Sequence, residues 1–308
     1  MSRIAPASSA AGLAARFAAF VTERPPLARA ETMQAFAAAG GTDASGEREI
    51  EDVRQRFVVA LRDRFTRKTP DGAADTTPGV SAAARFGQAI DDLVETCDGW
   101  LRRVALRASL TSDERIEILR GMMLTRATDN RLKTFFTGGE VRYEGTAFQG
   151  KGFRSLGQEA IYAAAIRLRR GEAFRTEGEW RGDVVAPLIR DLGAALAMKP
   201  DAATVRMVLS AQMGKAGPPM NGKDLHIGDF DHGILPASGP LAISTLTAGR
   251  MAVAVARDGS QRVAVSFIGE GGSSLGEWHE AINLCAARRL PAIFCVQNNQ
   301  TELSTPVR

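Results

Sequence analysis

Apolar residues at helical spacing fill the first part of the chain. Residues 46–68 combine Arg and Glu with apolar positions in the pattern of an amphipathic helix, and a second helix is predicted over 81–106. Between them, residues 69–80 are rich in Pro, Gly, Asp and Thr, which is typical of a linker. The Ala-rich residues 1–45 are broken by Pro and Gly pairs and predict only loose helices.

The pattern becomes more regular at Thr111. Thr111 and Glu114 have the spacing of a capping box, so a helix is predicted over 111–136. Three apolar positions of this helix follow at helical spacing: Ile116, Leu119 and Met123. Two further helices are predicted over 157–169 and over 183–198.

The last third of the chain predicts strands as well as a helix. Residues 262–268 are β-branched and followed by Gly, and residues 292–297 read as a second buried strand. The helix predicted over 274–290 joins them into a βαβ unit, whose parallel strands need helices on both faces. We therefore expect an α/β domain over 109–308, with a doubly wound, mainly parallel sheet. An Ala-rich, helical and partly flexible extension over 1–108 precedes it.

Composition and charge exclude several classes of function. No apolar run is long enough to span a membrane. The net charge of +4 is spread along the chain, and the basic run 167–170 lacks aromatic residues, which argues against nucleic-acid binding. Cys97, Cys285 and Cys295 lack the spacing of a zinc site and favour a reducing compartment. We expect the bacterial cytoplasm; the acid-free residues 1–22 leave a mitochondrial transit peptide, and so the matrix, as the alternative.

A glycine-rich loop that contains an acid follows the first predicted strand of the last third. Residues 269–272, Gly-Glu-Gly-Gly, stand where open α/β sheets bind ligands and where backbone amides can approach a phosphate. The spacing also suits a dinucleotide loop, which implies an NAD-dependent oxidoreductase. However, Glu270 would repel a pyrophosphate without a cation, and the next strand ends in Asn298 and Asn299 instead of a ribose-binding acid. A carboxylate and an amide oxygen at neighbouring strand ends favour Mg²⁺ holding a diphosphate.

The motif GEG, followed after 26 residues by NN, resembles the thiamine-diphosphate motif, whose first part is GDG in most family members. The run from Gly269 to Pro306 resembles the α subunit of the E1 component of the 2-oxo acid dehydrogenases, and the similarity extends back to about Thr111. Three other stretches carry the resemblance: 151–160, 187–193 and 222–242.

The resemblance implies the thiamine-diphosphate-binding fold and an oxidoreductase that uses thiamine diphosphate and Mg²⁺. The reaction would be the oxidative decarboxylation of a 2-oxo acid, with transfer of the acyl group to a lipoyl E2 component. An E1 β subunit would complete an α2β2 heterotetramer. Because the family continues well beyond Asn299, the domain is expected to be incomplete at its C-terminus and inactive alone.

Residue by residue, the resemblance implies a cofactor site. Glu270, Asn299 and the backbone carbonyl of Thr301 would bind Mg²⁺. The residues implied to bind the cofactor are Arg190, Gly239, Leu241, Gly269, Glu270, Gly271, Gly272 and Asn299. Arg190 would bind the diphosphate, a role that suits its charged fork. No catalytic residue is assigned in this chain, and His226 is either near the cofactor or a loop histidine without a ligand.

Two departures from the family pattern stand out. Glu270 replaces the usual Asp, which lengthens the arm by one methylene, and Ile189 stands where a Tyr hydroxyl usually faces the phosphate. GEG and the stretch 234–242 favour branched-chain 2-oxo acids over pyruvate. An acetoin dehydrogenase, a transketolase-like thiamine enzyme and a non-catalytic truncated paralogue remain as alternatives.

Overall fold

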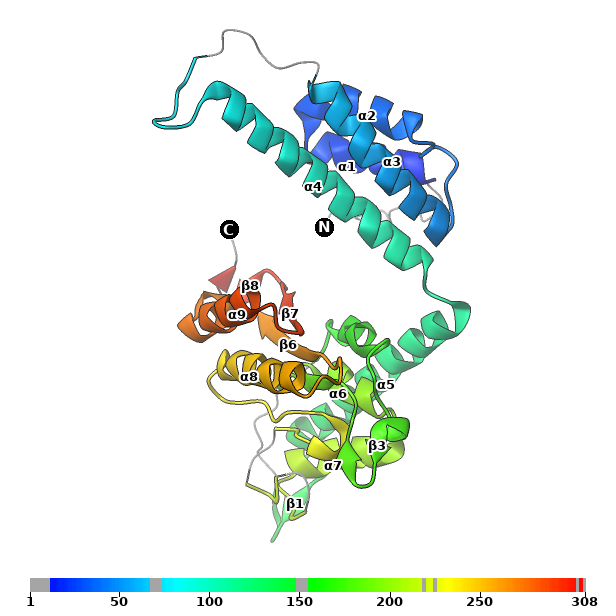
Figure 1. Ribbon diagram of the computed structural model, residues 1–308. Helices are drawn as coiled ribbons and strands as arrows, with labels where there is room; N and C mark the ends of the chain where they lie inside the picture. The colour runs from blue at the N-terminus through cyan, green and yellow to red at the C-terminus, as the bar shows by residue number, and fades with distance from the viewer. Residues whose placement is uncertain are drawn as a thin grey trace. The chain divides into compact units, whose positions relative to one another are not determined.

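The computed structural model describes residues 12–66, 74–147, 155–217, 220–223, 226–302 and 305–306 (Figure 1). The chain divides into two compact units, Met1–Thr111 and Ser112–Arg308. The start of the predicted extension and part of the predicted linker lie outside the described residues, as do 151–154 and 224–225 of the stretches that carry the resemblance.

The first unit consists of helices. They are α1 (Leu13–Glu23), the 3₁₀ turn η1 (Pro26–Ala28), α2 (Arg29–Ala38), α3 (Glu47–Thr66) and α4 (Ala82–Ala108). The helices predicted over 46–68 and 81–106 are therefore confirmed. Ser81 caps α4, because its hydroxyl accepts a hydrogen bond from the amide of Ala84 at 3.1 Å.

The prediction of only loose helices over 1–45 is wrong for α1 and α2. Phe17 of α1 and Phe36 of α2 are fully buried, and their ring centroids lie 4.3 Å apart. Phe57 of α3 and Trp100 of α4 pack on Phe17, with ring centroids at 5.5 and 5.2 Å. Because tertiary packing of an apolar face contributes more to helix stability than propensity does, this aromatic core orders segments whose composition predicts little.

The second unit is a mixed α/β structure. Its helices are α5 (Ser112–Thr137), α6 (Leu192–Met198), α7 (Ala202–Gln212), α8 (Ile243–Arg257) and α9 (Gly276–Arg288), with 3₁₀ turns η2 (Glu159–Ala165), η3 (Glu172–Phe174), η4 (Phe230–His232) and η5 (Gly272–Ser274). Its strands are β1 (Arg142–Tyr143), β2 (Thr146–Ala147), β3 (Arg175–Thr176), β4 (Glu179–Trp180), β5 (Val184–Ala186), β6 (Ala264–Gly269), β7 (Ala292–Gln297), β8 (Thr301–Glu302) and β9 (Thr305–Pro306). The predicted helices over 111–136 and 274–290 and both predicted strands are confirmed.

The sheet that organises this unit has the strand order β5-β6-β7, and both pairs are parallel. Strand β6 is buried along its whole length, and its side chains alternate between two layers. Val265 and Phe267 pack with α6 and η2, whereas Ala264 and Ile268 pack with the layer formed by α8 and α9. The predicted α/β fold with a parallel sheet is thereby confirmed (Figure 1).

The helix predicted over 183–198 is wrong in its first half. Residues 184–186 form β5, which pairs with β6, and the helix begins only at Leu192. Pro187 explains the break, because its ring disfavours the helical conformation at Ala186 and it cannot donate a helical hydrogen bond. Buried β-branched residues, Val184 and Val185, then extend the sheet.

Two smaller corrections concern 157–169 and β7. The first segment forms the 3₁₀ turn η2 instead of an α-helix, which places Tyr162 and Ala165 on one buried side at i,i+3 spacing.

Strand β7 is not fully buried, since Ile293 and Val296 are 46% and 49% exposed. It pairs with β6 alone among the described strands and therefore forms an edge of the sheet.

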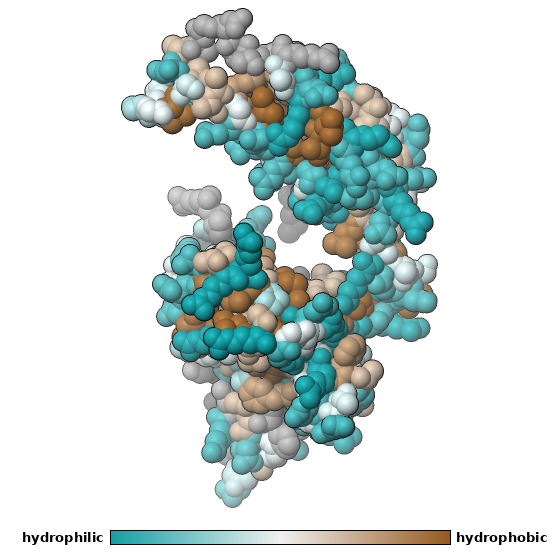
Figure 2. Space-filling view, in the orientation of Figure 1, coloured by the Kyte–Doolittle hydropathy of each residue, from teal (hydrophilic) through white to brown (hydrophobic). Residues whose placement is uncertain are grey.

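Hydrophilic residues cover most of the face of each unit that Figure 2 shows, and the hydrophobic residues there form small separate patches. Among the described residues, no helix is both long and apolar enough to cross a membrane.

Candidate functional site

The carboxyl ends of the three parallel strands meet at one edge of the sheet. Residues 187–191 follow β5, residues 269–272 end β6, and Asn298 and Asn299 follow β7. Gly269 and Gln297 are register partners in the pairing of β6 with β7. The segments that carry the predicted site residues Arg190, Glu270 and Asn299 are therefore neighbours, as expected for ligand sites in open α/β sheets.

Arg190 lies directly against Gly269. A methyl group at Gly269 would overlap the Arg190 guanidinium, so only glycine leaves room for this side chain. The Arg190 Nε donates a hydrogen bond to Oε1 of Gln297, at 3.1 Å. This bond fixes one edge of the guanidinium at the end of the central strand.

Asp191 fixes the orientation of the Gln297 side chain through a hydrogen bond. The Gln297 side-chain amide donates to one carboxylate oxygen of Asp191, and the Leu188 amide donates to the other at 2.7 Å. Asp191 is fully buried, and this burial raises the pKa of its carboxyl to about 6 despite the two hydrogen bonds and the nearby Arg190 charge. Asp191, Gln297 and Arg190 thus form a chain of contacts across the sheet edge.

Asp191 and Gln297 were not among the site residues predicted from the sequence. Gln297 could have been found from the sequence. It is a polar residue at the end of a predicted strand, directly before two Asn, and ligands bind at that edge of an open α/β sheet. Asp191 offered no such signal: nothing in the pattern distinguishes a buried acid from one exposed at a helix start.

The three predicted metal ligands meet at one backbone amide. The Thr301 amide donates to Oε1 of Glu270 at 2.8 Å and to Oδ1 of Asn299 at 3.0 Å. The Thr301 hydroxyl also donates to the Asn299 oxygen, at 3.1 Å. The structure therefore brings a carboxylate oxygen and an amide oxygen from adjacent strand ends together around Thr301.

This oxygen set suits a hard cation. The second carboxylate oxygen of Glu270, Oε2, is buried and has no hydrogen-bond partner among the described residues. An unpaired buried carboxylate oxygen is costly, and a cation is the partner that would satisfy it.

The set contains a single acid, and the described residues include no group of three or more His, Cys, Asp or Glu that could hold a metal. A cation here would need further oxygens from its ligand. That requirement agrees with Mg²⁺, which is usually held by one or two carboxylates together with phosphate oxygens.

Three further residues were named as candidates from the sequence: Leu241, Gly239 and His226. Leu241 lies beside the glycine loop, with its Cβ 3.6 Å from where a Cβ of Gly272 would stand. Gly239 is exposed, and no atom of a described residue lies within 4 Å of the position of a Cβ there, chain neighbours aside. His226 is half-buried, and its place near a cofactor stays a prediction.

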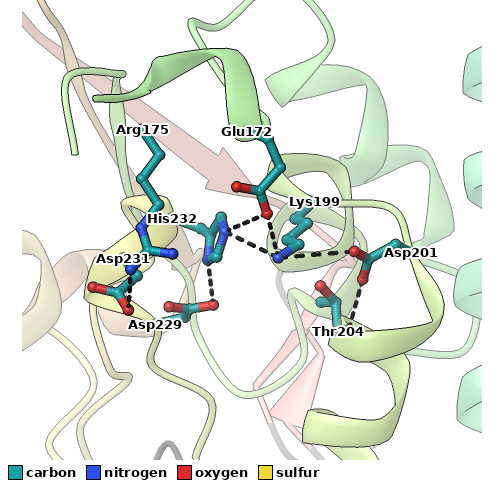
Figure 3. Close-up of polar contacts among 8 residues, drawn as sticks. All are labelled: Glu172, Arg175, Lys199, Asp201, Thr204, Asp229, Asp231 and His232. Atoms are coloured by element: carbon teal, nitrogen blue, oxygen red, sulfur yellow. Dashed lines mark hydrogen bonds and ion pairs between the residues drawn. The ribbon is translucent and has the colours of Figure 1, made fainter. Parts of the chain in front are cut away.

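A second polar cluster lies around His232 and was not predicted from the sequence (Figure 3). The imidazole Nδ1 lies 2.8 Å from Asp229, and Nε2 lies 3.2 Å from Glu172 and 3.1 Å from Lys199 Nζ. Lys199 pairs with Glu172 at 2.6 Å, which raises the pKa of the lysine and lowers that of the glutamate. His232, Glu172 and Lys199 thus have hydrogen-bond or ion-pair partners within the cluster, whereas Oε2 of Glu270 has none among the described residues.

The family model of the dehydrogenase E1 component matches residues 157–308, which include every predicted site residue. This segment belongs to the dehydrogenase E1 component family. The E1 segment thus contains the sheet, the glycine loop and Arg190, and the resemblance stated from the motifs is confirmed.

Relatives of the E1 segment are α subunits of 2-oxo acid dehydrogenases. The 2-oxoisovalerate dehydrogenase subunit alpha of Bacillus subtilis (strain 168) is 29% identical over 200 residues, which cover 64% of this chain and 54% of the relative. The pyruvate dehydrogenase E1 component subunit alpha of Staphylococcus aureus (strain Mu50 / ATCC 700699) is 39% identical over 79 residues, or 25% of this chain and 21% of the relative. The chain spans about half the length of the first relative.

Proposed function

We propose that this chain binds Mg²⁺ and thiamine diphosphate as the α subunit of a 2-oxo acid dehydrogenase E1 component. The observation that carries the proposal is the buried Oε2 of Glu270, which no described residue pairs with, beside an Asn299 oxygen and at the end of the central strand. Membership of residues 157–308 in the dehydrogenase E1 component family supports the choice of cofactor.

Each residue would have a distinct part in holding the cofactor. Glu270, Asn299 and the Thr301 carbonyl would bind Mg²⁺, and Arg190 would pair with the diphosphate from its position against Gly269. Amides of Gly271 and Gly272 would face the phosphates, and Leu241 would support the cofactor beside Gly272. When bound, thiamine diphosphate supplies the electron sink that permits loss of CO₂ from a 2-oxo acid.

The substrate would be a branched-chain 2-oxo acid, with pyruvate as the second choice, and the relatives include enzymes of both kinds. An E1 β subunit would complete an α2β2 heterotetramer, and a lipoyl E2 component would accept the acyl group. Because these relatives come from bacteria, we propose the bacterial cytoplasm as the location.

One observation favours a second candidate, a paralogue that keeps the fold for partner binding without catalysis. The Glu302 side chain fills the space directly over Gly271, where a phosphate would approach the loop. Ile189, which brings no hydroxyl to this edge of the sheet, points in the same direction.

Decarboxylation by the assembled E1 component separates these candidates. The full chain is purified together with an E1 β subunit, and CO₂ release is measured from 3-methyl-2-oxobutanoate and from pyruvate with thiamine diphosphate and Mg²⁺. We expect release that requires both additions and that falls at least tenfold in Arg190→Gln. Absence of CO₂ release from either acid by the purified complex contradicts the enzymatic proposal and supports the non-catalytic paralogue.

A further inference from the structure

Glu302 lies in the place that an anionic ligand of the glycine loop would need. A methyl group added at Gly271 would overlap the carboxylate, Cδ and Cγ of Glu302 at once, so this side chain covers the Cα of Gly271 closely. Glu302 ends the short strand β8, immediately after Thr301, and its side chain is half-buried.

No attractive contact with another described residue explains this position. Among the described residues, no hydrogen bond or ion pair holds the Glu302 carboxylate, although Arg190 lies against Gly269 only two residues away along the loop. The neighbouring carboxylate, Glu270, already has one buried oxygen that no residue in the described part of the chain pairs with. Two acids therefore stand beside one loop, and the charge of Arg190 can offset only one of them, an arrangement that disfavours a further anion.

We infer that Glu302 is a gate on the diphosphate site, which must leave Gly271 before a phosphate can bind there. The inference rests on the proposed function, because it concerns the same glycine loop. The attachment of β8 suggests how the gate opens. Thr301 is tied to the site through Glu270 and Asn299, and a cation that draws on these two oxygens would act on the residue next to Glu302.

The gate makes anion binding depend strongly on the cation. Without Mg²⁺, the Glu302 carboxylate stays beside Gly271 and repels a diphosphate. With Mg²⁺ at Glu270 and Asn299, the positive charge offsets this repulsion, and the more highly charged diphosphate competes with the Glu302 carboxylate for the place beside the cation. Glu302 thus sets the affinity and the cation dependence of the site without contacting the reacting atoms.

The test uses inorganic pyrophosphate as the probe, titrated calorimetrically into the full chain with and without Mg²⁺. The variants are Glu302→Ala, which removes both bulk and charge, and Glu302→Gln, which removes the charge alone. Glu280→Ala, an exposed glutamate of α9, is the control for loss of one negative charge. Circular dichroism melts of each variant establish that the fold is retained.

We expect Glu302→Ala to bind Mg-pyrophosphate at least tenfold more tightly than the wild-type chain, with Glu302→Gln between the two and Glu280→Ala unchanged. Equal affinity of Glu302→Ala and wild type overturns the gate and leaves the proposed function standing. Weaker binding by Glu302→Ala also overturns it, since Glu302 would then belong to the cation site. If no variant binds Mg-pyrophosphate, the proposed function fails as well, which distinguishes this outcome from the others.

Discussion

Asp191 is the buried acid on which the geometry of Arg190 depends. Its two oxygens accept hydrogen bonds from Gln297 and from the Leu188 amide, and Gln297 in turn accepts from Arg190. Replacing the carboxylate by an amide would turn the Gln297 side chain over, because two N–H groups cannot face each other. Arg190 would then lose its acceptor.

The raised pKa of Asp191 predicts an unusual pH dependence. The carboxyl titrates near 6 in the folded chain and near 3.9 when unfolded, so the folded state binds the proton more tightly. The stability contributed by this group is therefore present at low pH and is lost as the pH rises from about 4 to about 6. Urea unfolding of wild type and Asp191→Asn should show a stability difference that shifts by roughly 2–3 kcal/mol in favour of wild type between pH 7.5 and pH 4. A stability difference that stays constant between these two pH values would show that the pKa of Asp191 is not raised in the folded chain.

Gly269 tests the position of Arg190 directly. In Gly269→Ala the new methyl group displaces the flexible guanidinium, so the free energy of unfolding should change little while diphosphate affinity falls at least tenfold. Gly276→Ala is the matched control, because a Cβ at that position would have no atom of the described residues within 4 Å, chain neighbours aside. Affinity measured by calorimetry for both variants separates them, and equal affinities would remove Arg190 from the diphosphate site.

At the scale of elements, the sequence predicts what depends on local pattern. The long helices α3, α4 and α5 and the βαβ unit of β6, α9 and β7 follow from helical spacing and β-branched runs. Strand β5 was missed because three residues are too few to show a period, and its pairing with β6 joins segments about 80 residues apart. No local pattern carries information on such a pairing.

The candidate site shows the same limit. Glu270 and Asn299 could be predicted because each ends a strand and the motif has a fixed spacing. The positions of Asp191 and Glu302 could not, since both depend on how the loops after β5 and β7 fold back on the glycine loop. Burial of an acid and steric overlap at a glycine are properties of tertiary structure.

Helical spacing of apolar residues does not coincide with burial in α5. Ile116, Leu119 and Met123 of α5 have the spacing of a buried stripe but are 47%, 58% and 64% exposed. Their periodicity shows that the segment is a helix, and it does not show what the stripe packs against.

At the scale of the whole molecule, every proposed ligand contact lies within the unit Ser112–Arg308, and the unit Met1–Thr111 has its own aromatic core. Leu61→Ala removes a fully buried side chain from that core and should lower its free energy of unfolding by about 2–5 kcal/mol. We expect the affinity for Mg-thiamine diphosphate to stay within twofold of wild type, as measured by calorimetry below the unfolding temperature. A large loss of affinity would show that the first unit takes part in cofactor binding.

We propose above that Glu270 and its neighbours bind thiamine diphosphate through Mg²⁺. The decisive experiment is a calorimetric titration of the full chain with thiamine diphosphate, with and without Mg²⁺, in which wild type and Glu270→Ala are compared. We predict saturable binding by wild type only when Mg²⁺ is present, and no cation-dependent binding by Glu270→Ala. Binding of thiamine diphosphate that is equal with and without Mg²⁺, or unchanged in Glu270→Ala, would contradict the account.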